Sequence, residues 1–230
     1  MTIWILSIGT LLLSLWAAAR VKSVYNRYNT STVASGLSGA EAAHAILDRA
    51  GIHDVEITHH EEMLGDHYDP MHKRLVLSSV NYHGRTAAAL GVAAHECGHA
   101  IQHASAYGPL HWRMAAVSVT TYASQIVMWL PLLGMFTGLI APLTGAAIMA
   151  ACWGVIMLFN LITLPVEFNA SRRAKLILSG MGFIAPGEES TAVKKVLDAA
   201  AWTYVAAFIT SLVYLLWHLL PLLTGGRSRE

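Results

Sequence analysis

The chain has 230 residues, of which 55% are hydrophobic and only 13% are charged, with a formal net charge of +1. Soluble globular proteins carry about 25% charged residues, so this composition, with a mean hydropathy of +0.48, argues against an ordinary soluble domain and for a membrane protein. The near-neutral charge also argues against nucleic acid as a partner, because it provides no strong attraction for a polyanion.

The first apolar segment, residues 2–19, has no charged side chain. A membrane-spanning helix needs about 20 apolar residues, so this segment is close to the required length. A cleaved signal peptide would begin with basic residues, and these are missing here. We therefore predict a retained transmembrane helix within residues 1–22.

The polar region that follows, residues 23–113, begins with a helix signal. Ser38 precedes a helix-forming run and Glu41 lies three residues later, which is the pattern of an N-terminal capping box. Gly51 is typical of the residue that ends such a helix. The sequence therefore predicts a short helix between these positions.

Short extended segments and a second helix complete this region. Residues 55–58 and 74–78 predict strands, and the sequence HYDP at 67–70 predicts a turn. Residues 86–106 are rich in alanine with few helix breakers, and predict a helix. We expect the region to be a small α+β unit.

Residues 114–166 contain no Asp, Glu, Lys or Arg, and the run is long enough for a second and a third membrane span. Gly and Pro cluster near its middle, so we place the turn at 138–142. Residues 167–198 are predicted to be a helix and a loop. Residues 199–230 are predicted to contain a fourth span and a C-terminal tail. The fold class is therefore mainly α, with four transmembrane helices.

The distribution of basic residues predicts the orientation in the membrane. Basic side chains follow the first and third spans and precede the second and fourth, whereas the turn at 138–142 has none. The positive-inside rule then places residues 20–113 and 167–198 together on the cytoplasmic side, with both termini outside.

The strongest chemical signal is the sequence HECGH at residues 95–99, an HExxH motif. On a helix, His95 and His99 lie on one face and can both direct a ring nitrogen to a single zinc ion. Glu96 lies beside them, where it can take a proton from metal-bound water as the general base. Gly98 leaves room for another element to approach closely.

A catalytic zinc ion usually has three protein ligands and an open position for water. We predict Glu167 as the third ligand, since it directly follows the charge-free hairpin on the same predicted membrane side as the motif. His103 is a rival. It lies about 12 Å along the helix from His95 and is rotated by about 80°, so one ion would not easily reach both.

Weaker candidates surround these residues. His67, Tyr82 and His83 could stabilise a developing oxyanion, although an ordinary hydrogen-bonded role is the more common one for such residues. Ser171 lies four residues after Glu167 on the same helical face. Either Ser171 or Asn169 could orient a metal ligand.

The segments DHYDP, RLVLSS, YHGR, GVAAHECGHAIQHA and LPVEFNASRRA, with TYVAA in the last span, resemble the YugP-type neutral zinc metallopeptidases of bacterial membranes. The resemblance covers nearly the whole chain and implies a zincin-like catalytic unit in a multi-pass plasma-membrane protein. The layout is also similar to that of the HtpX-type proteases, which carry an Asp or Asn where Ser171 stands. That likeness implies that residues 74–78 form an edge strand that pairs with substrate.

These observations predict a zinc-dependent membrane endopeptidase with one zinc ion, acting on protein or peptide substrates at the cytoplasmic face of the bilayer. Two alternatives remain open at this point: a different metal hydrolase such as an amidase, and a zinc-binding membrane scaffold or chaperone. The intact Glu96 favours an enzyme, because metal binding alone does not need that carboxylate. The sequence does not indicate an oligomeric state.

Overall fold

The computed structural model describes residues 2–61 and 65–224. The chain divides into two compact units, each of which is built from several separate segments. The membrane unit consists of Met1–Leu15, Trp112–Leu164 and Thr203–Glu230, and the polar unit consists of Trp16–His111 and Pro165–Trp202.

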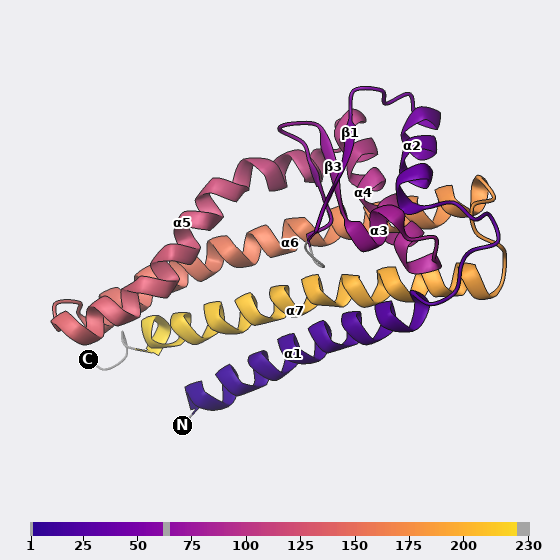
Figure 1. Ribbon diagram of the computed structural model, residues 1–230. Helices are drawn as coiled ribbons and strands as arrows, with labels where there is room; N and C mark the ends of the chain where they lie inside the picture. Colours follow the sequence, from indigo (N-terminus) through magenta and orange to yellow (C-terminus); the bar gives the residue numbers. More distant parts are fainter. Residues whose placement is uncertain (1, 62–64, 225–230) are drawn as a thin grey trace. The chain divides into compact units, whose positions relative to one another are not determined.

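Seven helices are present in the described residues (Figure 1). In chain order they are α1 (Thr2–Tyr28), α2 (Gly39–Arg49), α3 (Ser79–His83), α4 (Ala87–Ala104), α5 (Gly108–Thr137), α6 (Pro142–Gly180) and α7 (Glu188–Thr224). Four of them, α1, α5, α6 and α7, are long and apolar enough to span a membrane, as the composition predicts.

All four of these long helices continue beyond the spans expected from the sequence, and α5 already begins at Gly108. Helix α1 runs on to Tyr28, α6 passes without a break through residues 166 and 167, and α7 already begins at Glu188. The first charged residues beside an apolar run mark the expected edge of the lipid, and a helix can continue beyond this edge into water.

The turn between α5 and α6 lies where the sequence places it. Helix α5 ends at Thr137, Gly138 adopts a positive φ of 66°, and α6 begins at Pro142. Proline suits the first position of a helix because its missing N–H would have no partner there. The local sequence chemistry therefore determines this turn.

The polar unit contains one small sheet, with strands β1 (Glu56–His60), β2 (His67–Asp69) and β3 (Arg74–Ser78) in the order β1-β3-β2. Strand β3 is parallel to β1 and antiparallel to β2. Two expectations are therefore wrong. Residues 67–69 form a strand, and the turn follows them; β3 is the central strand, so it has no free edge for a substrate.

Helix α2 begins with the predicted capping box. The Ser38 hydroxyl accepts a hydrogen bond from the Glu41 N–H at 3.2 Å, and the Glu41 carboxylate accepts one from the Ser38 N–H at 2.7 Å. The helix ends just before Gly51, whose φ is +70°. Both ends of α2 therefore form as the sequence predicts.

Helix α4 lies in the middle of the core of the polar unit, which also includes residues of α2, β3, α6 and α7. Fully buried Leu75 and Leu77 come from β3, and Leu178 comes from α6. On α4 most of the buried residues are alanine or glycine, which lets neighbouring elements approach closely. This packing holds the HECGH segment against both the sheet and α6.

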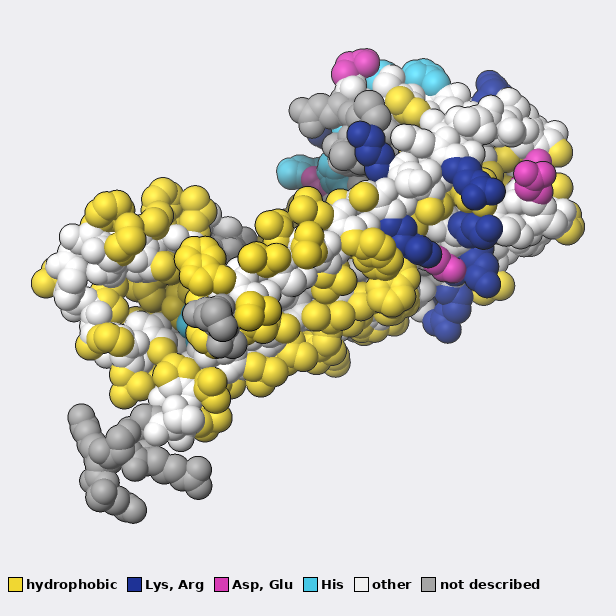
Figure 2. All heavy atoms as spheres, turned by 90° about the horizontal axis from the view of Figure 1, so that it is seen from below, with side chains coloured by type: hydrophobic (Ala, Val, Ile, Leu, Met, Phe, Trp, Pro, Cys, Tyr) yellow, Lys and Arg dark blue, Asp and Glu magenta, His cyan; other side chains and the backbone are white. Residues whose placement is uncertain are grey.

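The membrane unit is joined by a few polar contacts between its helices. The Tyr214 hydroxyl donates to Ser7 at 3.1 Å, the Asn160 amide donates to Ser211 at 3.1 Å, and the rings of Trp153 and Tyr214 stack. Hydrogen bonds between helices are common in membranes, where lipid offers no alternative partner. Hydrophobic side chains cover much of the surface of these helices on the face that Figure 2 shows.

Candidate metal centre

Helix α4 directs two imidazoles to the same side. His95 and His99 are four residues apart, and their ring centroids lie 4.8 Å apart with the planes almost perpendicular. The spacing follows from the helical repeat, in which residues i and i+4 are neighbours on one face. Both side chains are largely buried, with about a tenth of their surface exposed.

Helix α6 supplies a carboxylate to the same point. Glu167 is 2% exposed, and its Oε2 lies 3.2 Å from His95 Nε2 and 3.6 Å from His99 Nε2. One potential ligand atom from each of the three residues falls within 4.8 Å of the others. His103 is not a member of this group; its Nδ1 instead lies 2.9 Å from the hydroxyl of Tyr68 on β2.

These separations suit a zinc ion. With bonds of about 2.0–2.1 Å, two ligands of a tetrahedral zinc ion lie about 3.3–3.4 Å apart, which is close to both of the Glu167 distances. Two imidazoles and one carboxylate are also a common ligand set for zinc in enzymes. The residues present therefore fit the metal.

The close approach of α4 and α6 depends on Gly98. A Cβ atom at this position would lie 2.9 Å from the Ala170 carbonyl oxygen and 3.1 Å from its Cα. Ala170 lies between Glu167 and Ser171 in the sequence, so the two helices meet at the site itself. Glycine is needed here because backbone atoms, unlike side-chain ends, cannot turn away.

We therefore predict that Gly98→Ala destabilises the protein by about 1–3 kcal/mol, the usual range for overpacking, and weakens metal binding by moving Glu167 away from the histidines. Gly91→Ala is the matched control on the same helix, since its nearest neighbour is a Val193 side-chain carbon at 3.6 Å. Thermal unfolding and zinc content measure both effects. Equal behaviour of the two variants would show that the close approach is unimportant.

Polar side chains contact the outer nitrogen of each histidine. The Ser171 hydroxyl lies 3.2 Å from His95 Nδ1, and the Gln102 side-chain oxygen lies 3.0 Å from His99 Nδ1. Ser171 was a candidate from the sequence, whereas Gln102 was missed. Its position in the sequence could have indicated it, because Gln102 is a polar residue one turn after His99 on a helix whose inner face is otherwise largely apolar. Asn169, the other candidate, contacts Gln102 instead of a histidine.

Buried charges surround His99. Burial opposes its protonation, but the hydrogen bond to Glu167 and the charges of Glu96 and Glu167 outweigh this and raise the pKa of His99 above its ordinary value. Glu96 itself is only 7% exposed. A metal ion that binds at His99 Nε2 therefore competes with a proton for this nitrogen.

The remaining candidates form a different group. Tyr82 and His83 contact one another and His59, with ring centroids 4.9–5.5 Å apart, and the exposed His67 contacts the backbone oxygen of Gly65. These contacts do not join them to the three predicted ligands.

Tyr68, which contacts His103, was not predicted. Burial and the charges of Asp54 and Asp69 raise the pKa of Tyr68 to about 12, so its hydroxyl keeps its proton at neutral pH.

Comparison with known proteins decides the family. A family model described as "Putative neutral zinc metallopeptidase" matches residues 3–223. The chain belongs to this family. A curated relative, "Putative membrane protease YugP" of Bacillus subtilis (strain 168), is 44% identical over 220 residues, which is 96% of each chain. No solved structure gives a significant match.

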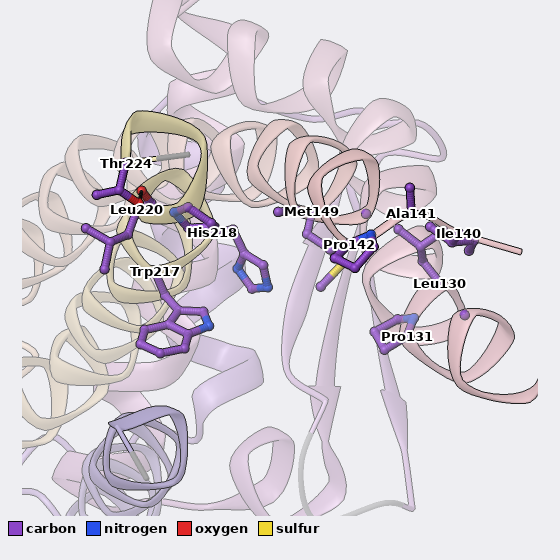
Figure 3. Close-up of a pocket in the computed structure, with 14 residues that line it drawn as sticks. Leu130, Pro131, Ile140, Ala141, Pro142, Met149, Trp217, His218, Leu220 and Thr224 are labelled. Carbon is purple, nitrogen blue, oxygen red and sulfur yellow. Dashed lines mark hydrogen bonds between the residues drawn. The ribbon is translucent and has the colours of Figure 1, made fainter. Parts of the chain in front are cut away.

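A zinc metallopeptidase needs its metal ligands at the place where substrate binds, and a cavity in the membrane unit does not provide them. This cavity of about 540 Å³ is lined by residues of α5, α6 and α7, and by the loop between α5 and α6 (Figure 3). His218 is the only titratable side chain among the lining residues, and its Nδ1 lies 2.7 Å from the Tyr214 carbonyl oxygen. The three residues that could hold zinc lie in the polar unit.

Proposed function

We propose that this protein is a zinc-dependent membrane endopeptidase whose single zinc ion is held by His95, His99 and Glu167. The observation that carries the proposal is the convergence of these three buried side chains, with separations that suit a tetrahedral zinc ion. Three protein ligands leave a fourth position for water. The HExxH segment and its helical setting also support a zincin-like arrangement.

When bound, the zinc ion supplies Lewis-acid activation of the attacking water and of the scissile carbonyl. Glu96 acts as the general base: its carboxylate takes a proton from the water and delivers it to the amide nitrogen as the peptide bond breaks. Its buried position excludes competing bulk water. Ser171 and Gln102 hold the two imidazoles from behind.

The proposed substrates are proteins in or at the bilayer, because α1, α6 and α7 continue directly from apolar runs into the polar unit that carries the site. The site is proposed to face the cytoplasm, since the basic residues flank the spans on this side. The relative in Bacillus subtilis, which is named "Putative membrane protease YugP", supports a location in a bacterial membrane.

Cleavage of an unfolded test protein tests this function. The purified protein should cleave it, lose activity when a chelator removes zinc, and regain activity when about one zinc ion per chain is restored. In sealed inside-out vesicles it should cleave a substrate added outside, and in right-side-out vesicles it should not. Activity that is independent of metal would reject the zinc mechanism, and the reverse vesicle result would reject the orientation.

A further inference from the structure

Gln102 is a fully buried polar residue on α4, with 0% of its surface exposed. A buried amide costs free energy unless its donors and acceptor are paired. All of the Gln102 side-chain bonds in the structure lead either to His99 or to α6: the oxygen contacts His99 Nδ1 at 3.0 Å, and the nitrogen donates to the Val166 carbonyl at 2.8 Å and to Asn169 Oδ1 at 3.0 Å.

The direction of each of these bonds follows from chemistry. The guanidinium of Arg173 can only donate, so the Asn169 atom that faces it at 2.8 Å must be the oxygen. That oxygen and the Val166 carbonyl can only accept, so the nitrogen of Gln102 must face both of them. The oxygen of Gln102 is then left to face His99, and the usual ambiguity between the two ends of an amide does not arise.

An amide oxygen cannot donate, so His99 Nδ1 must carry the hydrogen in this contact. The proton on one ring nitrogen determines what the other nitrogen can do. With its hydrogen on Nδ1, a neutral His99 keeps the lone pair on Nε2, which is the atom that faces Glu167 at 3.6 Å.

We propose that Arg173, Asn169 and Gln102 form a positioning relay that holds His99 in the tautomer that can bind zinc through Nε2. The inference rests on the proposed function, because it assigns a purpose to residues behind the proposed metal site. His95 has a weaker arrangement: its Nδ1 faces the hydroxyl of Ser171 at 3.2 Å, and a hydroxyl can donate as well as accept, so it does not select a tautomer.

The relay also joins the two helices of the site. Gln102 lies on α4, whereas Val166, Asn169 and Arg173 lie on α6, the helix that carries Glu167. The same hydrogen bonds that orient His99 thus keep α6 in register with α4. Removing an outer partner of a metal-bound histidine typically weakens metal binding by about 10–100-fold.

Two substitutions of similar size separate positioning from simple core stability. Gln102→Met removes both polar ends. Gln102→Glu keeps an oxygen that can accept from His99 Nδ1 but loses the donor to Val166 and Asn169. Both should lower the thermal stability of the metal-free protein. The Met variant should bind zinc about 10–100-fold more weakly, measured by competition with a chelator, and show an altered visible spectrum when loaded with Co²⁺. The Glu variant keeps the acceptor for His99 but loses the link to Asn169, so it should lose less zinc affinity than the Met variant.

Ser171→Ala, behind the other histidine, is the matched control and should weaken zinc binding less than Gln102→Met does. The relay is rejected if the Met variant binds zinc as tightly as the wild type, or if the Glu and Met variants lose the same affinity. Should the Met variant not fold, Asn169→Ala replaces it, with a smaller expected loss of affinity; unchanged affinity there also rejects the relay. A wild-type protein without zinc affinity would instead reject the proposed function and the relay together.

Discussion

Replacing Glu96 with Gln is expected to lower the rate of peptide hydrolysis by about 10²–10⁴-fold, the usual contribution of a general base, while the protein still binds about one zinc ion. The reason is that glutamine has the shape of glutamate but its amide cannot accept a proton from water. Glu96 is buried beside the three ligands without belonging to them, so its substitution leaves the metal site intact.

The measurement is cleavage of an unfolded test protein by both variants, with zinc determined on the same samples. Glu56→Gln serves as a control, because Glu56 is an exposed carboxylate on β1 paired with Arg74 and should not affect catalysis. Wild-type cleavage by the Glu96 variant would remove Glu96 from the mechanism. If neither the wild type nor the Glu96→Gln variant cleaves the test protein but both support the function in cells, a zinc-binding scaffold becomes the better explanation.

Replacing Glu167 with Ala is expected to weaken zinc binding by more than about 100-fold, since losing even an indirect partner of a ligand costs about 10–100-fold. Glu167 is the proposed ligand that comes from a different helix, and its carboxylate oxygen contacts both imidazoles. The two remaining histidines cannot complete a three-ligand site. Cleavage activity should be lost together with the metal.

His103→Ala is the informative comparison, because His103 is the rival ligand from the sequence and contacts Tyr68 in the structure. This variant should keep about one zinc ion per chain. Zinc affinity by chelator competition and thermal unfolding should be measured on both variants, so that loss of metal is distinguished from loss of fold. Unchanged zinc binding in Glu167→Ala would show that another residue is the third ligand.

Several features were predictable because local rules govern them. The capping box at Ser38 and the turn at Gly138 depend on residues that are neighbours in the chain. The shared face of His95 and His99 follows from helix geometry. The four apolar runs indicate candidate membrane helices because a bilayer demands a length and a composition that can be read directly.

Other features depend on partners that are distant in the sequence. Residues 67–69 contain turn-forming Asp and precede a proline, yet they form a strand because β3 offers hydrogen bonds to them. The order β1-β3-β2 makes β3 central, which no pattern within residues 74–78 reveals. Gln102 gains its importance from Val166 and Asn169, more than 60 residues away.

The sequence by itself determined which residues are candidates for the site: two histidines and a glutamate on one helix, and a later glutamate beyond a charge-free hairpin. It also determined the apolar runs that are long enough to span a membrane. The tertiary structure alone decided how α4 and α6 meet. Contact of Gly98 with the Ala170 backbone brings Glu167 within 3.2 Å of His95, and Gln102 bridges the same two helices. Such contacts depend on packing between segments far apart in the chain, and helical periodicity describes only one segment at a time.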